Sequence, residues 1–213
     1  MMLALPGLIL AFPAQTAVPA LILVWVPLGC VQFLQLRHDV DWSAVRWLLA
    51  GAILTLPVGS WILKGTDTET MQRIIGGVMV LLALLLQAKP GRPMKGERAA
   101  RFGAGLVSGI LAASTSVSGP PVVLLGLKQR WPSHRFRASL LTYFLLISLL
   151  TLPLHWRMDL LDGESLSLAL AALPGLVSGF FSGWWLRGRV RGSGFRWLAI
   201  LIVLGGGLTA LLF

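Results

Sequence analysis

The sequence predicts an all-α polytopic membrane protein made of two inverted repeats, each with a re-entrant helical hairpin followed by three transmembrane helices. Of its 213 residues, 56% are hydrophobic and 12% charged, and the mean hydropathy is +0.80, which is typical of a multi-pass membrane protein. All 26 charged side chains, 18 basic and 8 acidic, lie outside seven charge-free runs, one of which is broken by Ser, Thr, Gly and Pro. The runs are residues 1–36, 47–63, 74–88, 102–127, 138–154, 165–186 and 197–213.

The charge-free runs are long enough to cross a membrane. A helix needs roughly 20 residues to span the hydrocarbon core, and Lys or Arg at its ends can extend to the interface, so the shorter runs cross once with their flanks. No basic residue precedes the first run, so a cleavable signal peptide is not expected. The net charge of +10 lies in short loops, where it sets topology and contacts lipid headgroups, so nucleic acid is not expected as a partner. The single Cys30 excludes an intrachain disulfide.

Three spans are expected in the first half of the chain, at residues 17–36, 44–63 and 70–88. The charged segments between their charge-free runs, residues 37–46 and 64–73, each have a net charge of zero. Because these loops are not polarised, the orientation of the first half follows from that of the second.

The run from Phe102 to Leu127 is expected to form two short helices that meet at an elbow, AASTSVSGPP, from Ala112 to Pro121. The loops before and after it, residues 89–101 and 128–137, are each net +4 and therefore prefer the cytoplasm. A single crossing would place one of them outside, so the run is predicted to be a re-entrant hairpin. Irregular backbone at membrane depth is tolerated only where it is buried in protein or lines a cavity, so the elbow is also the expected ligand site.

The second half continues with three more spans, at residues 133–154, 165–186 and 197–213. An acidic loop with Asp159 and Asp162 follows the first of them and is assigned to the outside, and a basic loop at 187–196, net +4, follows the second and is assigned to the inside.

Short matches relate the two halves. WILKG at Trp61–Gly65 matches WWLRG at Trp184–Gly188, and Phe12-Pro13 matches Trp131-Pro132 at a similar offset. Because each half contains three spans, an odd number, a second copy must be inverted in the membrane, as in many secondary transporters. The predicted units are residues 1–88 as the first repeat, 89–101 as a basic cytoplasmic linker and 102–213 as the second repeat.

These features resemble a known family. The stretch GLVSGILAASTSVSGPPVVLLGL (Gly105–Leu127), followed by WPSHRFRASLLTYFLLISLL (Trp131–Leu150), is similar to the second-repeat signature of the TauE/SafE sulfite and organosulfonate exporter family. RHDVDW (Arg37–Trp42) is similar to part of the first-repeat pattern. The Gly-rich half-helix that the family has before the first elbow is not found, because Met1 lies almost at that elbow. Either the start is assigned too far downstream or half of one hairpin is lost, so the chain is expected to be N-terminally short and its first hairpin incomplete.

The elbow chemistry favours an anion. If the second helix begins near Gly119-Pro120, its first turn offers free N–H groups and the positive end of the helix dipole. Hydroxyl groups add donors, although they also commonly bond local carbonyls. Gln32 could line the path or bond a neighbouring helix, and Arg137 could attract anions at the cytoplasmic mouth or act only on topology. The candidate substrate-binding residues are Ser114, Thr115, Ser116, Ser118, Gly119, Val122, Val123, Gln32 and Arg137.

Several function classes are disfavoured. No carboxylate lies within a charge-free run, which argues against a proton-relay pump and an intramembrane protease. His38, His134 and His155 are expected in loops without metal-ligand spacing, so neither a metal nor another cofactor is predicted. No nucleophile, base and orienting residue occur together, so the protein is not expected to be an enzyme.

The sequence and the resemblance together predict an exporter of a small sulfur oxyanion, sulfite or a short organosulfonate, that works by alternating access in the bacterial inner membrane. Its expected partners are the small anionic substrate and the lipid bilayer, and a homo-oligomer stays open. Two alternatives also stay open, a non-transporting membrane scaffold or partner subunit and a carrier of another small anion.

Overall fold

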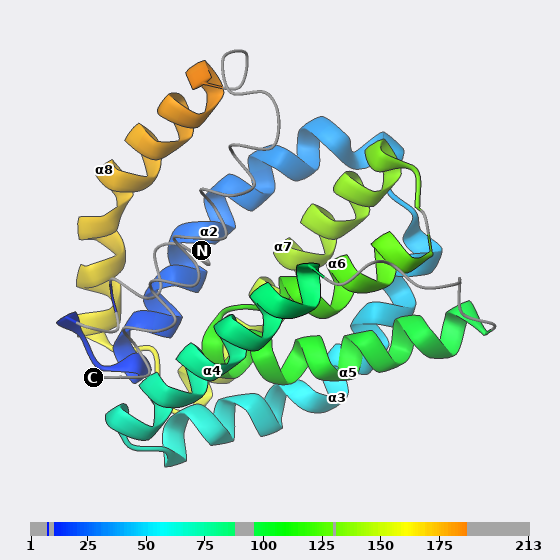
Figure 1. The fold of residues 1–213 in the computed structure, drawn as a ribbon. Helices are drawn as coiled ribbons and strands as arrows, with labels where there is room; N and C mark the ends of the chain where they lie inside the picture. Colours follow the sequence, from blue (N-terminus) through cyan, green and yellow to red (C-terminus); the bar gives the residue numbers. More distant parts are fainter. Residues whose placement is uncertain (1–7, 9–10, 88–95, 130, 187–213) are drawn as a thin grey trace.

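The computed structural model describes residues 8, 11–87, 96–129 and 131–186, and the regular elements in this part of the chain are all helices (Figure 1). The all-α prediction is therefore confirmed for these residues. Three helical segments, Ala14–Asp39, Trp42–Gly65 and Ser133–Arg157, are long and apolar enough to cross a membrane. The elements are α2 (Ala14–Leu36), η1 (Arg37–Asp39), α3 (Trp42–Gly65), α4 (Thr68–Gln87), α5 (Glu97–Thr115), α6 (Gly119–Lys128), α7 (Ser133–Arg157) and α8 (Gly163–Leu186).

The predicted spans at 17–36, 44–63, 70–88, 133–154 and 165–186 correspond to α2, α3, α4, α7 and α8, and no end differs by more than three residues. The predicted span at 197–213 and the incomplete first hairpin lie outside the described residues, apart from isolated positions near the N-terminus.

Aspartates explain why three helices begin where they do. Asp41, Asp67 and Asp162 each directly precede a helix, and each carboxylate accepts a hydrogen bond from a backbone N–H of its first turn, at 2.8 to 3.1 Å. Such caps satisfy N–H groups that have no partner within the helix. The backbone N–H of Thr70 lowers the pKa of Asp67, and that of Ser165 lowers the pKa of Asp162.

Helices α5 and α6 fold back on each other (Figure 1). Near the turn, Ser108 Oγ donates to the carbonyl of Ser118 at 2.6 Å. At the open end, Trp131 Nε1 donates to Glu97 Oε1 at 2.9 Å. The helices are thus a hairpin, but α5 has 19 residues, or about 28 Å, and the irregular backbone is confined to 116–118. Whether the hairpin is re-entrant in a bilayer stays a prediction.

The charged loops collect at two ends of the molecule. At one end, the Arg101 end, Arg101 pairs with Glu97 at 2.6 Å and with Asp41 at 3.6 Å, and its guanidinium lies 5.2 Å from the centre of the Trp131 ring. At the other, the Asp159 end, Lys64 pairs with Asp159 at 3.5 Å. The Arg101 end unites segments predicted to be cytoplasmic and the Asp159 end unites segments predicted to be external, so the packing agrees with one consistent assignment of sides.

Glycines let α3 and α5 come into backbone contact. Gly51 and Gly59 on α3 face Gly105 and Gly109 on α5, and a Cβ added to any of the four would lie 2.1 to 2.4 Å from an oxygen atom of the facing helix. Thr55 Oγ1 also donates across the interface to the carbonyl of Leu106 at 2.8 Å. Small residues spaced four apart are a recurrent means of close helix association in membranes. This interface holds α5, and with it the elbow at the end of α5, in place against α3.

The expectation that the three histidines lie in loops was wrong for His134 and His155. His38 is in η1, and both His134 and His155 are in α7, which continues past the charge-free run to Arg157. His155 is fully buried, and its Nε2 lies 3.1 Å from the carbonyl of Ala113 in the last turn of α5. A carbonyl only accepts, so Nε2 carries the hydrogen and donates to one of the four α5 carbonyls that have no partner within the helix. Among the described residues, no group of side chains has the make-up of a metal site.

His155→Leu is expected to reduce stability by about 1 to 3 kcal/mol, because it leaves the Ala113 carbonyl buried and unpaired. Thermal unfolding of the purified protein in detergent measures the loss. His134→Leu is the matched control, since His134 is exposed on the same helix, and its effect should be within about 0.5 kcal/mol. Equal losses in the two variants would contradict the capping role.

Candidate functional site

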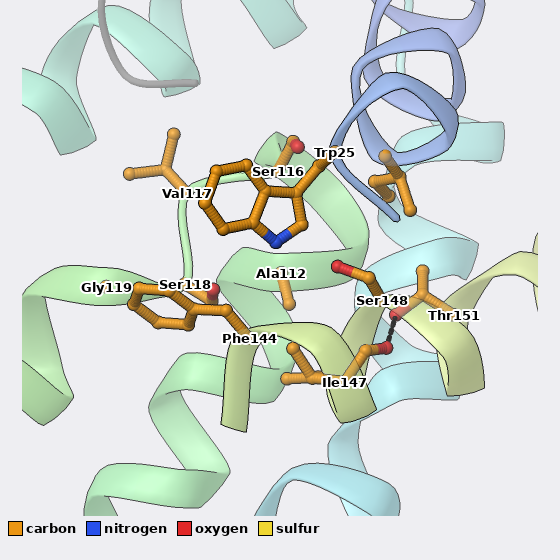
Figure 2. A pocket seen from close by; sticks show the side chains of 11 residues that line it. Trp25, Ala112, Ser116, Val117, Ser118, Gly119, Phe144, Ile147, Ser148 and Thr151 are labelled. Carbon is orange, nitrogen blue, oxygen red and sulfur yellow. Dashed lines mark hydrogen bonds between the residues drawn. The ribbon is translucent and has the colours of Figure 1, made fainter. Parts of the chain in front are cut away.

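A cavity of about 190 Å³ lies where the α5–α6 elbow meets α2 and α7 (Figure 2). The volume is far above the ~10–15 Å³ that one water molecule needs. Residues from all three parts of the chain contribute to the wall. They are Ile22, Trp25, Ala112, Ser116, Val117, Ser118, Gly119, Phe144, Ile147, Ser148 and Thr151.

The cavity lies near the middle of two candidate membrane spans. Trp25 is the central residue of α2, with 11 residues on either side between Ala14 and Leu36. Ile147 follows Ser133, the start of α7, by 14 residues and precedes Arg157 by 10. A substrate in this cavity would therefore lie far from both ends of these helices.

Ser116 is the residue at which the chain leaves α5. Its backbone is left-handed, with φ 57° and ψ 13°, and its N–H donates to the carbonyl of Ala112 at 3.1 Å. This conformation is uncommon for a residue with a Cβ and costs about 1 to 3 kcal/mol. The turn carries Ser116 to the cavity wall, where its Oγ is buried and has no hydrogen-bond partner among the described residues.

Helix α6 begins at Gly119, as predicted, with Ser118 as its N-cap residue. The N–H groups of the N-cap residue and the next three residues have no acceptor within a helix. Here the last two of these four are Pro120 and Pro121, which carry no N–H. The donors at this helix start therefore belong to Ser118 and Gly119, and both residues line the cavity.

Val122 and Val123, two of the candidate substrate-binding residues, lie outside the cavity wall. They come after the four positions whose N–H groups are free, because the two prolines occupy the last of those positions. The Val122 side chain is fully buried in the cluster formed with α3, α5 and α7, and Val123 is half-buried. Neither residue lines the cavity, so they form part of the helix behind it.

Ser114 and Thr115 bond within their own helix. Ser114 Oγ donates to the carbonyl of Ile110 at 2.7 Å, and Thr115 Oγ1 donates to that of Leu111 at 2.8 Å. Thr115 Oγ1 also accepts from the N–H of Val117 at 3.4 Å. Both hydroxyls thus follow the local pattern common for such residues, and Thr115 helps to hold the elbow in shape. Neither is part of the cavity wall.

Gln32 and Arg137 lie away from the cavity, toward the Arg101 end. Gln32 is half-buried, seven residues beyond Trp25 on α2, and Arg137 is exposed, ten residues before Ile147 on α7. At 1.5 Å per residue these separations are about 10 and 15 Å along the helix axes. Neither residue is part of the cavity wall.

The α2 and α7 walls were not predicted. Trp25 Nε1 is buried without a hydrogen-bond partner among the described residues, and Figure 2 shows it pointing into the cavity. From α7 come Ser148, Thr151 and Phe144, with Thr151 Oγ1 donating to the carbonyl of Ile147 at 2.7 Å. No sequence pattern marks these residues, because each stands alone in an apolar run and faces the elbow only after folding.

The cavity is uncharged but offers hydrogen-bond donors. No residue in its wall is acidic, basic or histidine. The donors include the Ser116 and Ser148 hydroxyls, the Trp25 indole N–H and the helix start at Ser118 and Gly119, where the α6 dipole adds partial positive charge. This set can bind a small anion through neutral groups and carries no nucleophile, base and orienting residue together.

Comparison with known proteins gives one result. A family model described as "Sulfite exporter TauE/SafE" matches residues 1–210 of the chain. Neither the curated proteins nor the solved structures include a match to it.

Proposed function

The chain belongs to the TauE/SafE sulfite exporter family, and from this we propose that it exports sulfite or a short organosulfonate by alternating access around the elbow cavity. The family itself indicates a membrane transporter of sulfur anions. The specific substrate and the alternating-access mechanism are our proposals, and they are based on the chemistry of the cavity.

The observation that carries the proposal is the buried Ser116 hydroxyl beside the start of α6, which has no hydrogen-bond partner in the part of the chain that the structure describes. A sulfite or sulfonate group has three oxygens that accept hydrogen bonds, and this corner of the cavity supplies donors from Ser116, Ser118 and Gly119. Hydrogen bonds to charged groups contribute about 1.5 to 3 kcal/mol each. Neutral donors bind an anion without forming an ion pair, so the bound anion can still dissociate from the cavity.

The remaining candidates take supporting roles in this proposal. Ser114 and Thr115 shape the end of α5, and Val122 and Val123 belong to the helix whose dipole faces the anion. Gln32 and Arg137 lie on the route from the Arg101 end, which we assign to the cytoplasm. An anion leaving a cell with a negative interior gains about 2.3 kcal/mol per charge per 100 mV of membrane potential, so export needs no proton relay in the cavity.

We further propose the inverted-repeat organisation, with repeats at 1–88 and 102–213 joined by the linker 89–101, in the bacterial inner membrane. The predicted sidedness is testable with single cysteines. In a Cys30→Ala background, Ala99→Cys and Ser133→Cys should be labelled only from the cytoplasm and Gly163→Cys only from outside. All three positions are exposed. Labelling of Ala99→Cys and Ser133→Cys from opposite sides would overturn both the re-entrant hairpin and the inverted repeat.

Flux of radiolabelled sulfite in proteoliposomes tests the proposed function. The purified full chain should carry sulfite above the rate of protein-free liposomes, and a potential that is negative on the substrate side should accelerate it. Flux of a different small anion without sulfite flux would change the substrate. A folded, correctly inserted protein that carries no anion would instead support the scaffold alternative.

A further inference from the structure

We infer that Trp25 is a substrate-binding residue whose indole N–H donates a hydrogen bond to an oxygen of the sulfur oxyanion, from the wall opposite the elbow. The inference rests on the proposed function, because it concerns the same cavity. It adds a residue from α2 that no sequence pattern marks.

The burial of the indole nitrogen is the first argument. Trp25 Nε1 is shielded from solvent and has no acceptor among the described residues. A buried Trp N–H usually finds a partner, and an unmet one costs free energy. The nitrogen points toward the cavity (Figure 2), so a small movement of the lining side chains would let it donate to an acceptor that enters the cavity.

A second unmet donor faces the same space. Ser116 is 7% exposed, and its Oγ also has no partner among the described residues. The two donors come from different elements, α2 and the elbow, and therefore from different predicted repeats. A ligand that satisfies both must present acceptors in more than one direction, as the three oxygens of sulfite or a sulfonate do.

The kind of donor also bears on selectivity. An indole N–H donates and cannot accept. Trp25 therefore favours the binding of ligands with acceptor oxygens, whereas an ammonium group would find no acceptor on it. Phe144, Ile22 and Ile147 supply the apolar wall around it. The cavity thereby selects a compact oxyanion through hydrogen-bond direction rather than through a positive side chain.

The Trp25→Phe variant isolates the N–H, because it keeps an aromatic ring and removes the donor. Calorimetric titration of the purified full chain with sulfite should show a dissociation constant raised about tenfold to a hundredfold, the range for a hydrogen bond to a charged group. In proteoliposomes the KM should rise similarly. The control is Trp61→Phe on α3, which is 70% exposed and should bind within twofold of the unmodified protein.

The outcomes separate this inference from the proposed function. Unchanged affinity in Trp25→Phe, together with lost binding in Gly119→Val, overturns the role of Trp25 and leaves the cavity in place. An unmodified protein that neither binds nor carries sulfite overturns both. If Trp25→Phe does not fold, fluorine NMR of 5-fluorotryptophan protein decides, with the Trp25 resonance identified by elimination after Trp→Phe variants have assigned the other eight of the nine tryptophans. The Trp25 signal should shift on adding sulfite, and a silent signal overturns the inference.

Discussion

Gly105→Ala is expected to be the most damaging single-methyl change in the described part of the protein. Its Cβ would lie 2.1 Å from the carbonyl oxygen of Leu48, and since that atom is backbone, relief requires α3 and α5 to move apart along their length. Overpacking a core typically costs 1 to 3 kcal/mol and occasionally more. We expect about 3 kcal/mol or more here, because the interface on either side would open as well.

Gly103→Ala on the same helix is the matched control. A Cβ at Gly103 meets nothing within 4 Å, so the change should stabilise the helix by about 0.5 to 1 kcal/mol through lower backbone entropy of the unfolded chain. The two variants should therefore shift the unfolding temperature in detergent in opposite directions. Shifts of the same sign and size would show that the α3–α5 contact does not set stability.

Gly119→Val is expected to abolish anion flux while leaving insertion and yield near normal. A Cβ at Gly119 would already lie 3.2 Å from Cζ of Phe144, and the two methyl groups of valine would extend into the cavity beside the donors of Ser118 and Gly119. We expect transport in proteoliposomes to fall at least about a hundredfold, which corresponds to losing about 2.7 kcal/mol, the equivalent of one or two hydrogen bonds to a charged group.

Two further variants distinguish obstruction from misfolding. Gly175→Val on α8 adds the same side chain at an exposed position where a Cβ meets nothing within 4 Å, and it should transport normally. Phe144→Leu combined with Gly119→Val makes room next to the new side chain and should restore part of the flux. Normal flux in Gly119→Val alone would move the substrate site away from the elbow.

The helices were predictable from the sequence because charge, Pro and Asp act locally. The hairpin helix α5 nevertheless begins five residues before its charge-free run, since Glu97 and Arg101 lie on the helix and pair with each other at 2.6 Å. A count of charges places such residues in a loop. His155 was misplaced for a related reason, because a polar residue after an apolar run still belongs to the helix when α5 offers it an acceptor.

The candidate site was predictable only in part. Ser114 and Ser116 are two residues apart and alike in sequence, yet one bonds its own helix and the other faces the cavity. The difference between them is the left-handed backbone at Ser116. A glycine at this position would have predicted such a turn, whereas a serine does not. Trp25 is 91 residues from Ser116 along the chain, so only the packing of α2 against the hairpin and α7 brings the two donors to one cavity.

The two ends of the molecule should respond differently to ionic strength. The Arg101 side chain is 10% exposed and pairs with two carboxylates beside the Trp131 ring, so mobile ions screen it only weakly. The Lys64–Asp159 pair at the opposite end has side chains that are 49% and 89% exposed, and such pairs contribute about 0 to 1 kcal/mol and are screened by salt. Rising salt should therefore weaken the Lys64–Asp159 contact at the Asp159 end more than the Arg101 pairs at the Arg101 end.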